Sequence, residues 1–435
     1  MTTACARVEV PRKPLIREEK RLPLRAFGGG GGSAVAAPAP LAFPATRGRW
    51  SASVAFYLQA SITVTFLAGS SAPTPLYPLY QAAWGFSPVS VTIVFGIYAL
   101  AVLGALLVAG RLSDHIGRRP VLIAAAAVQA ATMIIFATAD GLSSLLIARV
   151  IQGLSVGAAV AAVGAGLLDL DRSRGTIANA VAPLLGTATG GLVAGSMVQY
   201  LPAPTHLIYV VLSVIFVAQA IGVFFMPETM APRTGALASL KPRLSLPAAA
   251  RTPLLLAIPA LVATWALVGF YGSLAPTLVR TVLGFTSLLP SGLALFALAG
   301  SGGIAVILLR QHEPRTIASL GAFALLAGVG TAIAALSLRS ATLFYIGTAI
   351  SGAGFGAAFQ GAVRNVIPHA QPSERAGVLS VIFVVSYLAM GLPAVIAGTL
   401  IAKQGNVLAT ATQFGGVVMI LAALALLGAM RKGAR

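Results

Sequence analysis

From Trp50 onward, apolar stretches of about 20 residues alternate with short polar segments along the chain. A helix of about 20 apolar residues crosses the hydrocarbon core of a bilayer. Lipid offers no partners for backbone N–H and C=O groups, so each stretch is expected to be a helix. The alternation typical of a membrane β-barrel is missing from the sequence. Twelve spans are predicted, at 51–71, 88–109, 120–138, 142–167, 176–199, 206–226, 253–274, 286–309, 316–338, 341–363, 376–400 and 411–430.

A longer polar interval at 227–252 divides the spans six and six. It carries four Lys or Arg residues and several prolines, which is typical of a linker. The flanking segments, 50–226 and 253–430, are nearly equal in length. Matched halves indicate two duplicated six-helix bundles related by a pseudo-twofold axis. The predicted fold class is therefore an all-α integral membrane protein with twelve transmembrane helices in two bundles.

The two ends of the chain differ from the rest. Residues 1–49 hold nine Lys or Arg residues, a run of glycines and an Ala/Pro stretch, without apolar periodicity. This composition favours a disordered basic tail, and the alternative is an over-called start codon. The segment is a poor signal peptide because Gly and Pro break its apolar part. Residues 431–435 form a second short basic tail.

Composition and charge agree with a lipid environment. Of the 435 residues, 57% are hydrophobic and 9% are charged, whereas soluble domains carry about 25% charged residues. The net charge of +19 could indicate a nucleic-acid partner. However, 25 of the 29 Lys and Arg residues fall on one side if the amino terminus is cytoplasmic. This asymmetry follows the positive-inside rule, so both termini are expected in the cytoplasm of a bacterial cell, with anionic lipids as partners and no nucleic acid.

Several classes of chemistry are disfavoured. The chain has one cysteine, Cys5, and four histidines without ligand spacing, so no metal and no cofactor are expected. No nucleotide-binding loop of a primary pump is present. A polytopic membrane enzyme would need clustered His, Asp or Glu at membrane depth, which the sequence lacks. We therefore expect a protein that is not an enzyme. We also expect it to work as a monomer.

The segment 110–120 contains the most informative motif. Gly117 permits a tight turn. Asp114 can accept hydrogen bonds from amide groups at a helix start, or it can pair with Arg118. The alternative is a loop that only anchors the protein at the membrane surface. The motif reads Gly110-Arg-Leu-Ser-Asp114-His-Ile-Gly117-Arg118-Arg119-Pro120.

This loop resembles the signature of the major facilitator superfamily, Gly-x-Leu-x-Asp-x-x-Gly-Arg-Arg. It departs from the signature at His115, where a basic residue is usual. In that family the loop holds the two bundles together in the outward-facing state. By this resemblance, Asp114, Arg118, Gly110, Gly117 and Arg119 are expected to form a gating loop.

Three further segments extend the resemblance toward drug/proton antiporter-like members. The alternative interpretation of their glycines is that they only let neighbouring helices pack closely. The glycine-rich segment has Thr187 where the family usually has proline. The matches are Arg149-Val-Ile-Gln152-Gly153, Gly186-Thr-Ala-Thr-Gly190-Gly191 and Pro227-Glu228-Thr229.

Arg149 lies about seven residues, or about 10 Å, inside a predicted span. A charge at that depth is costly unless it faces a cavity or a partner. It could bind substrate or couple to a proton site, or its side chain could extend to the outer headgroups.

By the same resemblance, helices one, four, seven and ten line a central cavity. A cavity with few charges and one arginine favours a neutral, amphipathic or anionic solute. No acidic residue lies deep inside a predicted span, so proton coupling through a cavity carboxylate is not supported; Asp140, Asp169 and Asp171 are the nearest. The expected substrate or coupling residues are Gln59, Thr63, Arg149, Gln152, Trp265, Tyr271 and Gln360.

The predicted function is secondary transport of the major facilitator type. We expect export of small organic compounds by rocking of the two bundles, with protons as a candidate coupling ion. The alternative is a metabolite facilitator or importer that is not coupled to protons.

Overall fold

The computed structural model describes residues 49–242 and 244–430. Every regular element in these ranges is a helix, and twelve are long and apolar enough to cross a membrane. The all-α fold with twelve spans is therefore confirmed. The predicted tails, 1–49 and 431–435, lie outside the described residues except for Arg49. The main helices are α1 (Ala52–Ser71), α3 (Pro88–Ala109), α5 (Arg118–Ala137), α6 (Leu142–Leu170), α7 (Arg172–Tyr200), α8 (Leu207–Phe225), α10 (Ala248–Ser273), α12 (Leu289–Leu309), α13 (Pro314–Ser337), α14 (Ala341–Val366), α15 (Arg375–Gln404) and α16 (Val407–Met430).

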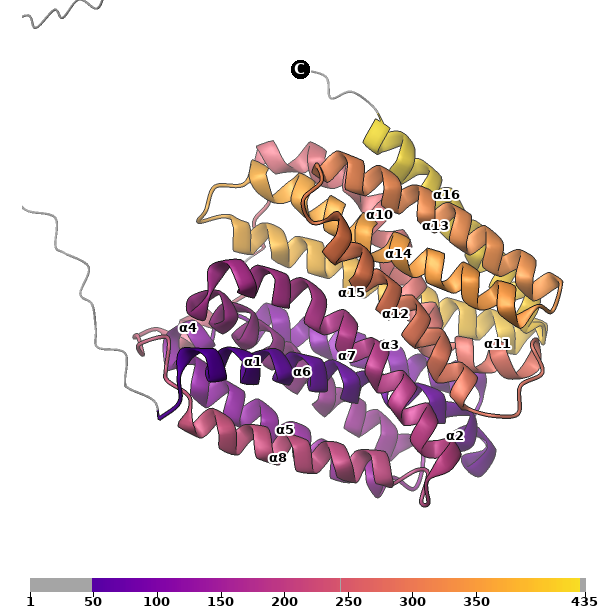
Figure 1. The fold of residues 1–435 in the computed structure, drawn as a ribbon, viewed down its shortest axis with the longest axis horizontal. Helices are drawn as coiled ribbons and strands as arrows, with labels where there is room; N and C mark the ends of the chain where they lie inside the picture. Colours follow the sequence, from indigo (N-terminus) through magenta and orange to yellow (C-terminus); the bar gives the residue numbers. More distant parts are fainter. Residues whose placement is uncertain (1–48, 243, 431–435) are drawn as a thin grey trace, which may run out of the picture. The chain divides into compact units, whose positions relative to one another are not determined.

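The helices form two equivalent halves, α1–α8 and α10–α16. In the first half, α1 packs on α6, α7 and α8, while α6 packs on α3 and α5, and α5 on α8. In the second half, α10 packs on α14, α15 and α16, while α14 packs on α12 and α13, and α13 on α16. The same six contacts recur in the same order. Figure 1 shows the first half in indigo to magenta and the second in orange to yellow.

The halves meet through two helix pairs, α3 with α15 and α7 with α12. An exchange of the halves turns one pair into the other, as a pseudo-twofold axis requires. Glycines bring the backbones close: a Cβ added at Gly292 of α12 would lie 2.3 Å from the carbonyl oxygen of Gly191 of α7. A Cβ added at Gly398 of α15 would meet the hydroxyl of Thr92 of α3. Small residues permit such approaches where lipid gives little hydrophobic drive.

The ends of the helix bundle are named here by what they carry. The loop end carries the 110–120 loop with the short helix α4 (Ser113–Ile116), and the far end carries α2 (Tyr77–Trp84) and α11 (Ala275–Thr281). Figure 1 draws α4 at the left and α2 and α11 at the right. Thr92, Gly191, Gly292 and Gly398 all lie in the far-end parts of their helices. The two halves are thus packed closely toward the far end.

Some helices extend beyond the predicted spans. Helix α6 continues to Leu170, and α7 begins at Arg172, where Asp171 caps it by accepting the amide of Arg174 at 2.9 Å. Helix α10 begins at Ala248 and not at 253. Hydropathy marks the part of a helix that lies in lipid, whereas the hydrogen-bonded helix continues into the polar interface.

The first helix of each half is interrupted near the far end. The sequence Gly-Ser-x-Ala-Pro-Thr occurs at 69–74 and again at 272–277. Helix α1 ends before Pro73 and gives way to the 3₁₀ turn η1 (Thr74–Leu76) and α2. Helix α10 ends at Ser273 and gives way to α11. The two breaks touch, because the hydroxyl of Thr74 donates to the carbonyl oxygen of Gly272 at 3.1 Å.

Candidate functional site

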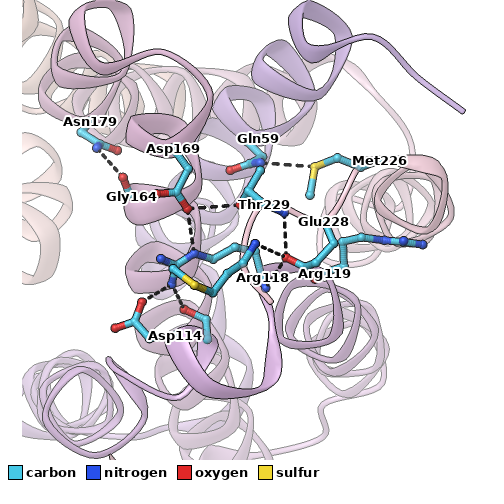
Figure 2. A network of polar contacts seen from close by, with 12 residues as sticks. Gln59, Asp114, Arg118, Arg119, Gly164, Asp169, Asn179, Met226, Glu228 and Thr229 are labelled. Atoms are coloured by element: carbon cyan, nitrogen blue, oxygen red, sulfur yellow. Dashed lines mark hydrogen bonds and ion pairs between the residues drawn. The ribbon is translucent and has the colours of Figure 1, made fainter. Parts of the chain in front are cut away.

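A network of charged groups lies at the loop end, within the first half (Figure 2). At its centre is Arg118, the first residue of α5, which is 3% exposed. Its guanidinium contacts Asp114 Oδ1 at 2.5 Å and Asp169 Oδ2 at 3.2 Å, and it donates to Ser113 Oγ at 2.7 Å. Of the two roles open to Asp114, the pairing with Arg118 is the one observed. Asp169, at the end of α6, is drawn into the same network.

The carboxylate of Glu228 caps the start of α5. It accepts the backbone N–H groups of Arg118 at 2.8 Å and Arg119 at 3.0 Å. It also accepts the amides of Thr229 and Met230, at 3.0 and 3.1 Å. The N-cap residue Gly117 has no side chain to do this. A carboxylate at a helix start satisfies free amides and interacts favourably with the helix dipole. The Pro-Glu-Thr segment thus closes the first half onto the 110–120 loop.

Gly117 is required by this geometry for two reasons. Its φ of 97° and ψ of 157° lie in a region that side chains strongly disfavour. A Cβ at this position would also lie 2.6 Å from Glu228 Oε2. The glycine of the motif therefore makes room for the capping carboxylate.

We expect Gly117→Ala to lower the free energy of unfolding by about 1–3 kcal/mol, the usual cost of a strained backbone. Thermal unfolding in detergent measures the change. Gly141→Ala is the matched control, since Gly141 has extended backbone and open space around its Cβ position. Equal stability of the two variants would contradict the assigned geometry.

His115 connects the loop to the polar segment between the halves. Its carbonyl oxygen accepts the amide of Arg233 at 2.7 Å, and its Nδ1 lies 3.1 Å from the carbonyl oxygen of Thr234. Gly235, at φ 96°, turns the chain beside the imidazole ring. The residue that departs from the family signature thus holds the linker against the loop.

Arg149 and its neighbours form a second polar network, deep in the first half. Arg149 has no solvent exposure. Its guanidinium donates to the carbonyl oxygen of Ser70 at 2.9 Å, to Gln152 Oε1 at 2.7 Å and to the hydroxyl of Tyr77 at 2.5 Å. Gln152 donates in turn to the carbonyl oxygen of Gly69 at 3.1 Å. The side chain stays inside the helix bundle and does not extend to its surface.

The interruption of α1 explains these partners. Pro73 has no N–H group to donate to the carbonyl oxygen of Gly69, four residues earlier. Free carbonyls also give a helix end a negative partial charge. Arg149 and Gln152, three residues apart on α6, supply side-chain donors and a positive charge at that end. The guanidinium also lies over the rings of Tyr98 and Phe136, at 5.2 and 5.6 Å.

The other two predicted residues of helix one are buried in the first half. Gln59 has no exposure, donates to the sulfur of Met226 at 3.2 Å, and occupies the space left by Gly166 of α6. Its Oε1 has no hydrogen-bond partner among the described residues. Thr63 is 4% exposed. Among the described residues, neither side chain has a hydrogen bond to Arg149 or Gln152.

The glycine-rich segment of α7 faces two neighbours. Added Cβ atoms at Gly186 and Gly190 would lie 2.3 and 2.2 Å from carbonyl oxygens of α1. Gly191 faces Leu295 of α12, in the other half. These glycines therefore pack α7 against a helix of its own half on one side and against the second half on the other.

The predicted residues of the second half lie in different places. Trp265 of α10 packs against the core of the first half and contacts Phe359 and Tyr387, with ring centroids 5.6 and 4.9 Å away. Tyr271 instead bonds Thr348 within the core of the second half, at 2.7 Å. We name Trp265, Phe359 and Tyr387 the central aromatic group.

Two buried polar atoms belong to Trp265 and to Gln360, the residue after Phe359 on α14. In the described part of the chain, Trp265 Nε1 and Gln360 Oε1 have no hydrogen-bond partner. Gln360 follows Phe359 on α14 and reaches the carbonyl oxygen of Val306 only at 3.5 Å. Buried polar atoms are costly when unpaired, so these two are available to a ligand or to water.

Sequence reasoning missed several residues of both networks. Glu228 and Asp169 were noted, but their meeting with Arg118 was not expected. The interruption at Pro73 was a usable signal for the Arg149 partners, since proline within an apolar stretch frees a carbonyl group. Nothing in the sequence distinguished Tyr387 from other aromatic residues.

Comparisons with known proteins agree with this architecture. The sequence profile of the Major Facilitator Superfamily matches residues 59–394. The cephamycin export protein CmcT of Amycolatopsis lactamdurans is 37% identical over 140 residues, 30% of this chain and 28% of that protein. The multidrug resistance protein MdtL of Klebsiella pneumoniae (strain 342) is 27% identical over 301 residues, 64% of this chain and 73% of that protein. A bacterial homologue of the human lysosomal transporter Spinster, solved inward-facing and unoccupied, superimposes with a TM-score of 0.69 at 13% identity, over 87% of this chain and 97% of that one.

Proposed function

The chain belongs to the Major Facilitator Superfamily, and we propose that it exports small organic compounds by alternating access of its two halves. The observation that carries this proposal is the pair of equivalent halves, whose main contacts with each other are α3 with α15 and α7 with α12. With these two helix pairs as the main contacts, the two halves can rotate relative to each other around a central transport path. The printed names of CmcT and MdtL, an export protein and a multidrug resistance protein, support the outward direction.

We place the cargo against the central aromatic group. Trp265 and Tyr387 lie where the second half packs on the first, the position a central path requires. Among the described residues, Trp265 Nε1 is an unpaired donor in this group, and Gln360 Oε1, on the residue after Phe359, is an unpaired acceptor. Aromatic faces with few polar groups suit a neutral or amphipathic organic molecule. In this proposal Arg149 and Gln152 do not contact the cargo. They hold the broken end of α1 in place, and they influence transport through the position of that helix.

The carboxylates leave the driving ion open. At the loop end, Asp114 and Asp169 form ion pairs with Arg118, and Glu228 accepts backbone hydrogen bonds. Asp140, between α5 and α6, accepts the hydroxyl of Ser144 at 2.6 Å, which lowers the pKa of its carboxyl. A carboxyl with a lowered pKa is a poor proton carrier at neutral pH. Transport without protons is the second candidate mechanism.

We also propose that the loop end faces the bacterial cytoplasm with both termini. The excess of Lys and Arg in the loops of that end supports this orientation. The 110–120 loop then lies where it can act as a cytoplasmic gate.

Transport into inside-out vesicles tests the proposed function. Export predicts accumulation of a labelled organic compound inside such vesicles, and proton antiport predicts that an acid-inside pH gradient increases the rate. Accumulation only in right-side-out vesicles would contradict export. A rate that the gradient never changes would favour the mechanism without protons.

We expect Trp265→Phe to raise the KM of a transported compound between about twofold and tenfold, the effect of one lost hydrogen bond. Packing on Tyr387 is kept, and Nε1 has no partner in the described chain, so thermal stability should not change. Trp84→Phe is the control, because Trp84 stacks on Tyr80 at the far end. An unchanged KM in Trp265→Phe would remove Trp265 from the cargo site.

A further inference from the structure

A pocket of about 470 Å³ lies at the far end, outside both polar networks. One wall comes from α2, with Pro78 and Gln81, and the other from α11 and the loop after it, with Thr277, Arg280 and Phe285. Volumes of 300–1,000 Å³ are typical of small-molecule sites. The pocket is therefore large enough for an organic ligand.

Arg280 gives the pocket its chemistry. It is the single charged residue of the lining, and it is exposed. Within the described part of the chain, no ion pair or hydrogen bond of its side chain is recorded. An unpaired guanidinium with Gln81 and hydroxyl groups beside it, Thr277 and Thr286, is suited to hold a carboxylate through two parallel hydrogen bonds.

Apart from Thr281, whose hydroxyl donates to the carbonyl oxygen of Thr277 at 2.8 Å, the rest of the lining is apolar. Pro78 and Phe285 flank the polar groups, and they can cover the hydrocarbon or aromatic part of a ligand. An inorganic anion would use only the polar groups of the lining, whereas an organic carboxylate also uses Pro78 and Phe285. The composition of the pocket favours the second.

The two walls belong to different halves of the protein. Helix α2 continues the first helix of the first half, and α11 continues the first helix of the second. The walls are tied by Thr74 on the carbonyl oxygen of Gly272, and Ser287, just after the pocket, donates to Gln199 of α7 at 2.8 Å. Opening of the far end must separate these walls and dismantle the pocket.

We propose that this pocket binds an organic carboxylate with an apolar body, and that its occupation stabilises the state in which the far end is closed. A ligand that binds one state only shifts the equilibrium toward that state. The binding stands independently of the transport direction, while the effect on the state rests on the two-half mechanism proposed above. The pocket would make the protein sensitive to organic acids on the far side of the membrane.

Calorimetric titration of the purified full chain with 1-naphthoate tests the binding. We expect Arg280→Gln to weaken binding at least about tenfold, since it removes a charge-assisted pair, and methyl 1-naphthoate to bind as weakly. Arg339→Gln is the control, with the same charge change at an exposed residue of the same end. Equal affinity of Arg280→Gln and the unchanged protein would overturn the site.

A cysteine at the closed far end tests the effect on the state. Ser273 is 1% exposed, and Cys5 is the only native cysteine, so Ser273→Cys with Cys5→Ser gives one reporter. We expect saturating 1-naphthoate to slow labelling by a membrane-impermeant maleimide several-fold, and not to do so when Arg280→Gln is added. An unchanged labelling rate would overturn the state dependence. Absence of labelling without ligand would contradict the alternating mechanism itself, while the calorimetric result would still decide the site.

Discussion

Replacement of Arg149 by glutamine is expected to lower the transport rate by about two orders of magnitude and the free energy of unfolding by about 3 kcal/mol. The substitution leaves the carbonyl oxygen of Ser70 and the hydroxyl of Tyr77 without their donor in a buried core. The broken end of α1 then keeps only the hydrogen bond from Gln152 of α6 to Gly69, among those of this network. Transport in vesicles and thermal unfolding in detergent measure the two effects.

Arg149→Lys separates charge from geometry. A lysine keeps the positive charge, but one ammonium group cannot replace the planar guanidinium that joins Ser70, Gln152 and Tyr77. We therefore expect Arg149→Lys to be nearly as impaired as Arg149→Gln. Full activity of the lysine variant would show that charge alone is required and that the anchoring of α1 is not.

Arg174 provides a matched control for Arg149. Its guanidinium also bonds a tyrosine hydroxyl, that of Tyr57 at 2.6 Å, and lies over two aromatic rings. Arg174 is exposed, however, and exposed contacts of this kind contribute less than about 1 kcal/mol. Arg174→Lys should therefore behave almost as the unchanged protein does.

Glu228→Gln is expected to reduce transport at least tenfold and to lower the thermal stability. Glutamine keeps one acceptor oxygen, and its NH₂ group would face an N–H of Arg118 or Arg119, which Glu228 now accepts at 2.8 and 3.0 Å. The start of α5 would lose its cap, and the Arg118 side chain would lose its fixed position against Asp114 and Asp169. Transport assays and thermal unfolding together measure the loss.

The second half contains the control for Glu228. Glu374 is the N-cap residue of α15, and among the described residues its carboxylate accepts one backbone amide, that of Gln371 at 3.1 Å. Glu374→Gln makes the same chemical change where little depends on it, so we expect less than a twofold effect. An equal loss in the two variants would mean that the cap of α5 has no special role.

The fold could be predicted from the sequence because lipid imposes one strong rule. Each span needs about 20 apolar residues, and the twelve predicted stretches correspond to the twelve candidate spans. The start of α10 at Ala248 and the end of α6 at Leu170 were missed, because the first turns of α10 and the last turn of α6 carry polar residues that lower the hydropathy there.

The candidate site was predictable in part. The short-range pair of Asp114 and Arg118 was predictable because only three residues separate the two charges in one short loop. The cap by Glu228 does not, because 110 residues separate it from Arg118 and only the folded half brings them together. The central aromatic group depends on how α10, α14 and α15 are rotated toward the first half, and a hydrophobic pattern that is apolar on all sides does not specify rotation.

The charge network at the loop end also has a consequence for biosynthesis. Its partners, from Asp114 through Asp169 and Glu228 to Thr229, all precede Ala248, where the second half begins. A growing chain therefore has every partner of the network available before the first helix of the second half is made. Domains fold in order from the amino terminus during synthesis. The first half can therefore form this charge network by itself, and the second half then packs against a first half that is already folded.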